Sequence, residues 1–186
     1  PNPEGKGGVA MLDLIVNSLR MRPDRIIMGE IRRQKEAETM FEAVHTGHSC
    51  YGTFHANDAF ETVTRLTNPP INLPKLVLPA LSVILVQNRN RRTNQRRTLQ
   101  FAEILPDGNL NIVYQYNPLK DTMVKKNNLK IVNKTIEIFT GMTDKDIAKD
   151  LTEKKKILKW IVDNDISNLN DIGLLMSKYY RGELKL

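Results

Sequence analysis

An α/β fold followed by a small helical domain is predicted by three features of the sequence. Short apolar runs such as Ile26–Met28 alternate with segments of helical periodicity in the first part of the chain, which is typical of βα units. Two later segments of strand composition flank the dipeptide Asp107-Gly108, a strong hairpin signal. From about residue 120 the chain becomes polar and basic, and its pattern then becomes helical. The predicted domains are therefore residues 1–118 and residues 119–186.

Composition limits the classes of function. The chain has 186 residues, of which 40% are hydrophobic, and this is enough for a sizeable core in one or two domains. Its longest apolar runs, such as Val83–Val86, are far too short to span a bilayer, and no secretory signal is recognisable. The single cysteine, Cys50, excludes an internal disulfide framework and suits a reducing cytoplasm. The formal net charge of +7 favours an anionic partner: a nucleotide, a membrane surface or a nucleic acid.

Three helices are expected in the first domain, because apolar residues recur there at helical spacing. They should cover Met11–Met21, Gln34–Val44 and Ala59–Leu66. Asp58 or Asn57 can cap the third helix, and the prolines from Pro69 onward end it.

Strands are expected where β-branched and aromatic residues gather between and after these helices. The segments are Ile26–Met28, Tyr51–Phe54, Leu81–Gln87, Thr98–Leu105 and Leu110–Tyr116. Beyond them, the polar and basic segment Lys120–Lys130 is expected to be a loop. A short element should follow over Ile131–Phe139, and Thr143 should cap the first of the last helices.

A carboxylate and a histidine follow two neighbouring strands of this sheet. Glu30 comes directly after Ile26–Met28 and Gly29, and His55 follows Tyr51–Phe54. Parallel strands joined by a helix end at the same edge of a sheet, so Glu30 and His55 are expected on one rim. Ligands of open α/β sheets bind at that rim. An acid there can orient an attacking water or reach a magnesium-bound water, and a histidine can sense a phosphate by hydrogen bonding.

A long ordered series of segments resembles the secretion and type IV pilus motor ATPases, a RecA-like branch of the P-loop NTPases, and especially their archaeal pilus and type II secretion members. The segment Leu19–Arg32 is similar to the Walker B segment of that family. The segment Glu36–His48, continuing to His55–Asn57, is similar to its histidine box. The likeness continues through Arg65–Pro74, Val86–Thr93 and Arg96–Ile104, and extends to Tyr179-Tyr180.

The resemblance implies a fold and a set of residue roles. Residues 1–118 would be the C-terminal half of a RecA-like ATPase domain, and a helical C-terminal domain would follow. ATP and Mg²⁺ would be the cofactors, with Glu30 acting on the attacking water and indirectly on the metal, and with His55 sensing the γ-phosphate. The histidine box comprises Gly47, His48, Thr53 and His55. For His48, beside Gly47 at the end of a helix, a capping or packing role is the alternative.

The resemblance also implies partners and a location. Members of the family work as hexameric rings, so a homo-oligomer is expected. A membrane platform protein of a secretion or pilus system would be the second partner, and the location would be the cytoplasmic face of the cell membrane.

The chain departs from the family pattern at the phosphate-binding loop. No Gly-x-x-x-x-Gly-Lys-Ser/Thr motif occurs in the sequence, and Gly5-Lys6 in the glycine-rich opening lacks both the earlier glycine and the following hydroxyl. We therefore expect the chain to be a fragment, a processed half or a split-gene product. A P-loop-bearing N-terminal half, in the same or a separate chain, would be needed for activity, and the chain alone should have negligible ATPase activity.

Several arginines surround the Walker B segment. Arg20, Arg22 and Arg32 are candidates to reach a nucleotide, including one held by a neighbouring subunit. An arginine finger can accelerate phosphoryl transfer about 10³–10⁵-fold. The alternative is a set of salt bridges to Asp13, Asp24 and Glu36.

A zinc site is a second alternative for the histidines. His45, His48, Cys50 and His55 have the residue types of zinc ligands. Alternation along a strand would place Cys50 and His55 on opposite faces, so the spacing argues against zinc.

The densest basic run is Arg89–Arg97. It can be a solvated loop between two strands, a contact with another subunit or with the membrane platform, or a nucleic-acid patch. No aromatic residue is interleaved with the arginines before Phe101, which disfavours nucleic acid. At the level of the whole chain, two alternatives to a motor subunit therefore stay open: a non-catalytic assembly or docking module, and a basic nucleic-acid-binding protein of the RecA-like group.

Overall fold

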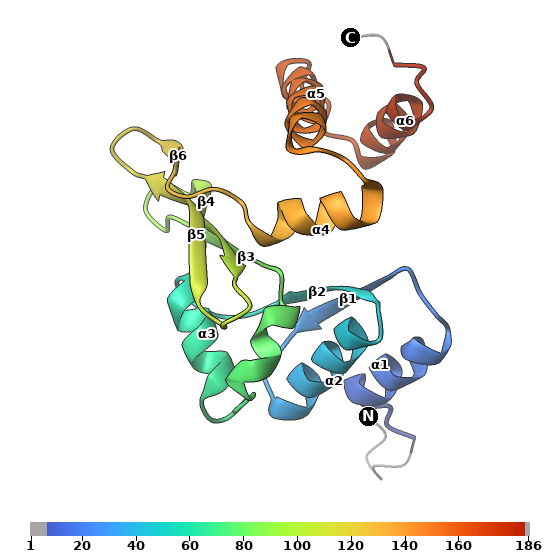
Figure 1. The fold of residues 1–186 in the computed structure, drawn as a ribbon, viewed down its shortest axis with the longest axis vertical. Helices are drawn as coiled ribbons and strands as arrows, with labels where there is room; N and C mark the ends of the chain where they lie inside the picture. Colours follow the sequence, from blue (N-terminus) through green and yellow to red (C-terminus); the bar gives the residue numbers. More distant parts are fainter. Residues whose placement is uncertain (1–6, 185–186) are drawn as a thin grey trace. The chain divides into compact units, whose positions relative to one another are not determined.

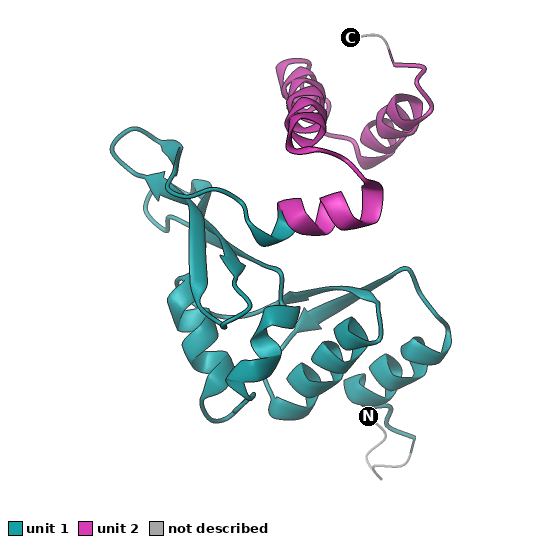
Figure 2. Cartoon of the chain, viewed as in Figure 1, with its two compact units in different colours: residues 1–132 teal, residues 133–186 magenta. Residues whose placement is uncertain are grey.

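The computed structural model describes residues 7–184, and the Gly5-Lys6 pair considered above lies outside them. The chain forms two compact units, Pro1–Val132 and Asn133–Leu186, which are coloured separately in Figure 2. This division lies beyond the boundary expected after residue 118. The difference arises because a further antiparallel strand and the first residues of the next helix belong to the first unit.

The first unit begins with a helix and a parallel βαβ unit. The elements are α1 (Met11–Arg20), β1 (Arg25–Glu30), α2 (Gln34–His45) and β2 (Ser49–Thr53) (Figure 1). The two strands pair in parallel, with Arg25 opposite Ser49 and Glu30 opposite Thr53. Burial alternates along β1, which is the pattern of a strand with one covered face. The expected helices, strands and parallel connection of this segment are therefore confirmed.

A helix and a 3₁₀ turn lead from the βαβ unit into an antiparallel sheet. The elements are α3 (Ala59–Thr67), η1 (Lys75–Ala80), β3 (Val83–Arg89), β4 (Arg96–Ile104), β5 (Leu110–Asn117) and β6 (Thr122–Lys125). The four strands lie in sequence order. In the turn between β4 and β5, Gly108 has φ +76° and donates its N–H to the Leu105 carbonyl at 2.8 Å. The predicted hairpin with an Asp-Gly turn is confirmed, and the chain is a mixed α/β protein with parallel and antiparallel sheets.

The loop predicted for Lys120–Lys130 is wrong in part, because Thr122–Lys125 form strand β6. Thr122 pairs with Asn117 directly across a short turn, and Lys125 pairs with Tyr114. The basic composition concealed the strand, since lysines are frequent on the edge strands of sheets.

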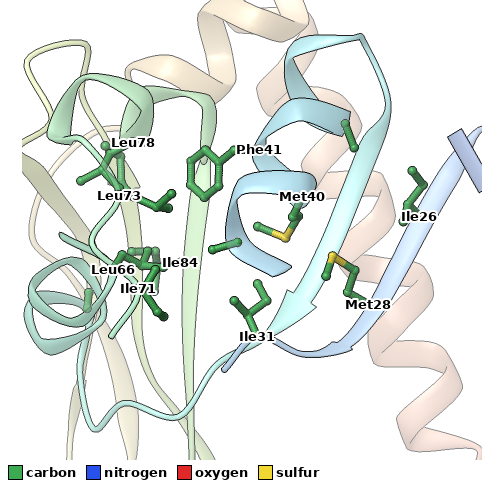
Figure 3. Close-up of a cluster of buried hydrophobic side chains, with 14 of the residues drawn as sticks. Ile26, Met28, Ile31, Met40, Phe41, Leu66, Ile71, Leu73, Leu78 and Ile84 are labelled. Atoms are coloured by element: carbon green, nitrogen blue, oxygen red, sulfur yellow. The ribbon is translucent and has the colours of Figure 1, made fainter. Parts of the chain in front are cut away.

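The core of the first unit joins both sheets. Figure 3 shows that β1, α2, α3, η1 and β3 all supply side chains to one cluster. Its labelled members are Ile26, Met28, Ile31, Met40, Phe41, Leu66, Ile71, Leu73, Leu78 and Ile84. Each side chain of this size contributes about 1.5–3 kcal/mol when it is fully buried. The shared cluster therefore makes the βαβ unit and the antiparallel sheet one folded body.

Two core side chains approach β2 closely at Gly52. A Cβ atom at Gly52 would lie 2.9 Å from Ile31 Cδ1 and 3.2 Å from Met40 Sδ. At Gly29, on the neighbouring strand, a Cβ atom would meet nothing within 4 Å. The absence of a side chain at Gly52 thus lets Ile31 and Met40 pack against the strand.

A buried carboxylate on β4 accepts the first amide groups of the helix that follows the sheet. Glu103 is 0% exposed and accepts hydrogen bonds from the backbone N–H groups of residues 130–132 at 2.9–3.0 Å. Its fourth donor is Asn111 Nδ2 on β5, at 2.9 Å. The amide groups at a helix start have no partner inside the helix, so the carboxylate satisfies them.

The second unit is helical. It contains most of α4 (Ile131–Thr140) together with α5 (Asp144–Asp163) and α6 (Leu169–Tyr180). The predicted cap at Thr143 is confirmed, because Thr143 Oγ1 accepts from Asp146 N–H and Asp146 accepts from Thr143 N–H. Ile147, Ile157 and Ile161 form the buried stripe of α5. Within residues 7–184, no helix combines the length and the apolar character that crossing a bilayer requires.

Candidate functional site

Glu30 is the last residue of β1 and lies at the carboxyl end of the parallel pair. Ile26 and Met28 anchor the strand in the core, and the Glu30 carboxylate follows at the end of the strand, where the side chain is partly exposed. Next to it, Thr53 Oγ1 on β2 donates a hydrogen bond to the Gly29 carbonyl, and Ile31 N–H donates to the Thr53 carbonyl at 3.0 Å. These bonds hold the ends of the two strands together, so the position of Glu30 is set by the sheet.

His55 lies on the same rim, two residues beyond the end of β2. Its Nε2 is 3.1 Å from Glu30 Oε1. The expectation that Glu30 and His55 share one edge of the sheet is therefore confirmed. The His55 side chain is 78% exposed and that of Glu30 is 24% exposed, so both groups can be reached from solvent.

Arg32 makes the second contact to the acid. Its Nη2 donates to Glu30 Oε2 at 2.5 Å. This hydrogen bond, together with the charges of Arg32 and His55, lowers the pKa of the Glu30 carboxyl below its ordinary value. Glu30 is therefore an ionised acceptor at neutral pH, with one oxygen facing an arginine and the other facing a histidine.

A polar network next to His55 was not predicted from the sequence. Arg65 on α3 donates to the His55 carbonyl, lies 5.4 Å from the centroid of the Phe54 ring, and is 3.7 Å from Glu61 Oε1. Glu61 Oε2 in turn accepts from the backbone and side-chain amide groups of Asn57. The segment that carries His55 is thus fastened to the start of α3. The spacing of four between Glu61 and Arg65 was a signal for their ion pair.

The other members of the predicted histidine box are divided between the two ends of β2. Thr53 lies at the carboxyl end, opposite Glu30. Gly47 and His48 precede the first residue of β2, which pairs with Arg25 at the opposite end of β1. His48 Nδ1 lies 3.3 Å from the Ala43 carbonyl and 3.2 Å from Thr46 Oγ1. The structure therefore places His48 at the end of α2, with the contacts of a capping residue, and does not bring it to Glu30.

The predicted arginines also separate. Arg20 ends α1 and Arg22 lies in the following turn with φ +51°, both before β1 begins. Only Arg32 is next to Glu30. The alternative salt bridges to Asp13, Asp24 and Glu36 do not occur for these arginines within residues 7–184. Instead, Glu36 accepts the backbone N–H groups of Arg32 and Arg33 at the start of α2.

The described part of the chain holds no group of three or more histidine, cysteine or acidic side chains that could bind a metal ion. Cys50 Sγ lies near the His48 carbonyl at 3.6 Å, and burial raises the pKa of its thiol. His55 points to Glu30 instead.

Comparison with known proteins identifies the family to which the chain is similar. Residues 2–137 match the family model described as type II/IV secretion system protein. A similar protein, described as uncharacterized, from Methanocaldococcus jannaschii is 33% identical over 159 residues, which are 81% of this chain and 58% of that protein. A second from the same organism is 32% identical over 188 residues, which are 95% of this chain and 34% of that protein.

A named relative is the type IV pilus assembly ATPase PilB of Myxococcus xanthus. It is 47% identical over 74 residues, which are 40% of this chain and 13% of that protein. The chain thus spans less than two thirds of each of these relatives. The family model covers most of the chain, and the chain therefore belongs to the type II/IV secretion system protein family.

Proposed function

We propose that this chain supplies the Walker B acid and the histidine box of an ATP-hydrolysing motor, as the C-terminal half of a RecA-like domain. The observation that carries the proposal is the 3.1 Å contact between Glu30 and His55 at the carboxyl end of a parallel strand pair. This rim is where open α/β sheets bind their ligands. The motor would serve pilus assembly, in line with the name of the Myxococcus xanthus relative, or protein secretion, in line with the description of the family. It would work at the cytoplasmic face of the membrane.

The residues at the rim fit magnesium and a nucleotide. Mg²⁺ keeps several waters and is usually held by one or two carboxylates together with substrate phosphates. Glu30 offers one ionised carboxylate of this kind. When bound, the metal would neutralise the negative charge that develops on the phosphates.

Each residue at the rim has a distinct proposed role. Glu30 accepts a hydrogen bond from the attacking water and orients it, and it can take up the proton that the water releases. His55 senses the γ-phosphate, because the Nε2 that faces Glu30 can turn its proton toward a phosphate oxygen. Arg32 donates a hydrogen bond to Glu30 Oε2 and so holds the carboxylate in position while the site is empty of substrate.

Arg32 is also the arginine nearest to the acid, so it is our first candidate to stabilise phosphate charge. To reach a phosphate, its guanidinium would leave the Glu30 carboxylate. Arg20 and Arg22 lie at the other end of β1, so within the same subunit they are badly placed for this task. In a hexameric ring they could act only on the site of a neighbouring subunit.

One face of the β1–β2 sheet carries exposed apolar side chains. This supports the proposal that a second half of the domain packs against it. Ile27 and Tyr51 are partners across the pair, so they lie on the same face, and they are 80% and 57% exposed. Parallel sheets are normally covered on both faces. We propose that a P-loop-bearing α/β half, in the same or a separate chain, covers this face and supplies the phosphate-binding loop. A membrane platform protein would be the partner of the assembled ring.

A binding experiment tests the proposal. The chain would be titrated in a calorimeter with Mg²⁺ and a non-hydrolysable ATP analogue, first alone and then after mixing with a P-loop-bearing half. We expect binding in the mixture only. Tight binding by the chain alone would place the phosphate site elsewhere, and no binding in either case would favour a non-catalytic assembly module.

The role of Glu30 is tested in the complete motor with Glu30→Gln, which removes the charge and keeps the size. We expect kcat to fall about 10²-fold or more, since general-base groups contribute this much, while the affinity for the ATP analogue stays unchanged. Glu42→Gln on the exposed face of α2 is the matched control. Equal turnover of the Glu30 and Glu42 variants would refute the proposed role.

A further inference from the structure

The antiparallel sheet carries two turns at one of its ends. Successive strands run in opposite directions, so the β3–β4 and β5–β6 connections lie at the same end and the β4–β5 turn lies at the other. Figure 1 shows both connections at that end of the sheet. A bidentate ion pair links them, because Arg97 Nε and Nη2 donate to the two carboxylate oxygens of Asp121 at 2.6 and 2.7 Å. We call residues 89–97 and 117–126 together the basic end.

The basic end carries the entire charge excess of the chain. Its nineteen residues include five arginines, three lysines and one aspartate, a net charge of +7. The formal net charge of the whole chain is also +7, so the remaining residues sum to zero. The net positive charge is therefore concentrated in these two segments and is not spread over the whole chain.

Most of these charges are free to meet an anionic partner. Within residues 7–184, Arg97 is the single arginine of the basic end that forms a salt bridge. Arg91, Arg92 and Arg96 are exposed. The β3–β4 turn that presents them is ordered by its own hydrogen bonds, among them Arg89 Nε to Asn94 Oδ1 at 2.6 Å and Arg92 N–H to Asn90 Oδ1 at 2.9 Å.

An apolar side chain stands at the tip of the second turn. Leu119 is 96% exposed, between Pro118 and Lys120. Asn117 Oδ1 accepts the backbone N–H groups of Leu119 and Lys120 at 3.0 and 3.3 Å. The turn therefore holds the leucine outward in a fixed conformation instead of letting it fold onto the sheet. Met123 on β6 is a second exposed apolar residue near this tip.

We propose that the basic end binds the surface of a membrane that contains anionic lipids. The arginines and lysines would contact the lipid headgroups, and Leu119 would enter the boundary between headgroups and acyl chains. Basic residues near an anionic leaflet each strengthen binding, and an apolar side chain among them adds insertion. The basic end has both features, and they lie on two turns and the strand ends beside them, which the Arg97–Asp121 ion pair links.

The same features disfavour a nucleic acid as the partner. Binding of single strands uses aromatic platforms on which bases stack. Residues 89–97 and 117–126 include no aromatic residue, and the hydroxyl of the adjacent Tyr116 donates to Asp121 Oδ1 at 2.7 Å. A protruding leucine makes no hydrogen bond or ion pair to a phosphate, but it suits a lipid interface.

Vesicle sedimentation tests the proposal with the whole chain. The probes are vesicles of phosphatidylcholine alone and vesicles in which part of it is replaced by phosphatidylglycerol. We expect binding to the anionic vesicles only, weakened by salt because the charges are exposed. The triple variant Arg91→Gln, Arg92→Gln, Arg96→Gln should lower the partition coefficient about 100-fold. Leu119→Ser should lower it about tenfold and leave the salt dependence unchanged.

A matched control removes the same number of charges elsewhere. Lys149, Lys155 and Lys156 are exposed on α5, and their replacement by glutamine should leave vesicle binding unchanged. Circular dichroism would verify that every variant is folded. An equal loss in both triple variants, or no binding of the parent chain to anionic vesicles, would overturn the proposal. Binding to duplex DNA or polyglutamate without binding to vesicles would overturn it too, and would assign the basic end to an acidic macromolecule.

Discussion

The carboxylate of Glu103 and the side-chain amide of Asn111 meet at 2.9 Å in the interior of the antiparallel sheet. Asn111 also donates to the Asn128 carbonyl at 3.0 Å, and Glu103 accepts the backbone N–H groups at the start of α4. The two side chains therefore join strands β4 and β5 to the chain segment that leads out of the first unit. A buried charge is tolerated here because both carboxylate oxygens of Glu103 accept hydrogen bonds.

Glu103→Gln is expected to destabilise the first unit by about 2–3 kcal/mol. The glutamine amide has one acceptor oxygen and would turn its NH₂ group toward backbone donors, and hydrogen bonds to a charged group are worth about 1.5–3 kcal/mol. Urea denaturation followed by circular dichroism measures the change. Glu42→Gln, an exposed substitution of the same kind, should change stability by less than about 0.5 kcal/mol. Equal stability of the two variants would contradict the capping role.

The same carboxylate predicts a dependence of stability on pH. Burial raises the pKa of Glu103, but the hydrogen bonds from residues 130–132 and Asn111 outweigh burial and bring the pKa below its ordinary value. A lowered pKa in the folded state means that the stabilisation is complete above the unfolded-state pKa, about 4.3, and is lost as the pH falls through the folded-state value. The stability difference between parent and Glu103→Gln should therefore shrink in acid, and a constant difference would contradict this account.

Gly52→Ala tests the close approach on β2. The new methyl group would have to displace the Ile31 Cδ1 and Met40 Sδ atoms, which are flexible ends of side chains, so the cost should be near the lower end of the overpacking range, about 1 kcal/mol. Gly29→Ala on the paired strand is the control, because a Cβ atom there meets nothing within 4 Å. Both substitutions reduce the conformational entropy of the unfolded chain to the same extent. The difference between their denaturation midpoints therefore measures the effect of the contact with Ile31 and Met40. Equal midpoints would show that the core accommodates the methyl group.

Much of the local structure could be predicted from the sequence, because it depends on neighbouring residues. Helical spacing of apolar residues located α1 to α3, and Asp58 and Thr143 signalled two helix starts by their own side chains. The shared sheet edge of Glu30 and His55 could be predicted too, because a parallel βαβ unit brings the carboxyl ends of its two strands together whatever their exact length.

What could not be predicted depends on contacts between distant positions. Glu103 lies 27 to 29 residues before the amide groups it accepts, and no local pattern in the sequence relates them. Arg65 reaches the His55 carbonyl across ten residues by folding α3 back on the loop. The family resemblance placed His48 and His55 in one histidine box, but a strand of five residues separates the two and carries them to opposite ends of the sheet.

Arg32→Gln is expected to raise the pKa of Glu30 toward its ordinary value. The hydrogen bond from Arg32 is the largest cause of the lowered pKa, and His55 contributes a smaller part. The pH titration of the Glu30 carboxyl carbon by NMR measures the change directly. Because the folded-state pKa is lowered, any stabilisation by the pair is present above the unfolded-state pKa and lost in acid, so parent and variant should converge there. Arg33→Gln is the control, and an unchanged Glu30 titration in Arg32→Gln would contradict the pairing.

Arg65→Lys is expected to loosen the segment that carries His55, although the charge is kept. A lysine lacks the planar guanidinium that lies over Phe54 while it donates to the His55 carbonyl. The loss of a cation–π contact of about 0.5–1 kcal/mol should speed amide hydrogen exchange in residues 54–58 about two- to fivefold. Exchange in β1 should stay unchanged, because Ile26 and Met28 hold that strand from the core. Arg33→Lys is the matched control, and equal protection of residues 54–58 in both variants would mean that the backbone of the loop, and not Arg65, positions the histidine.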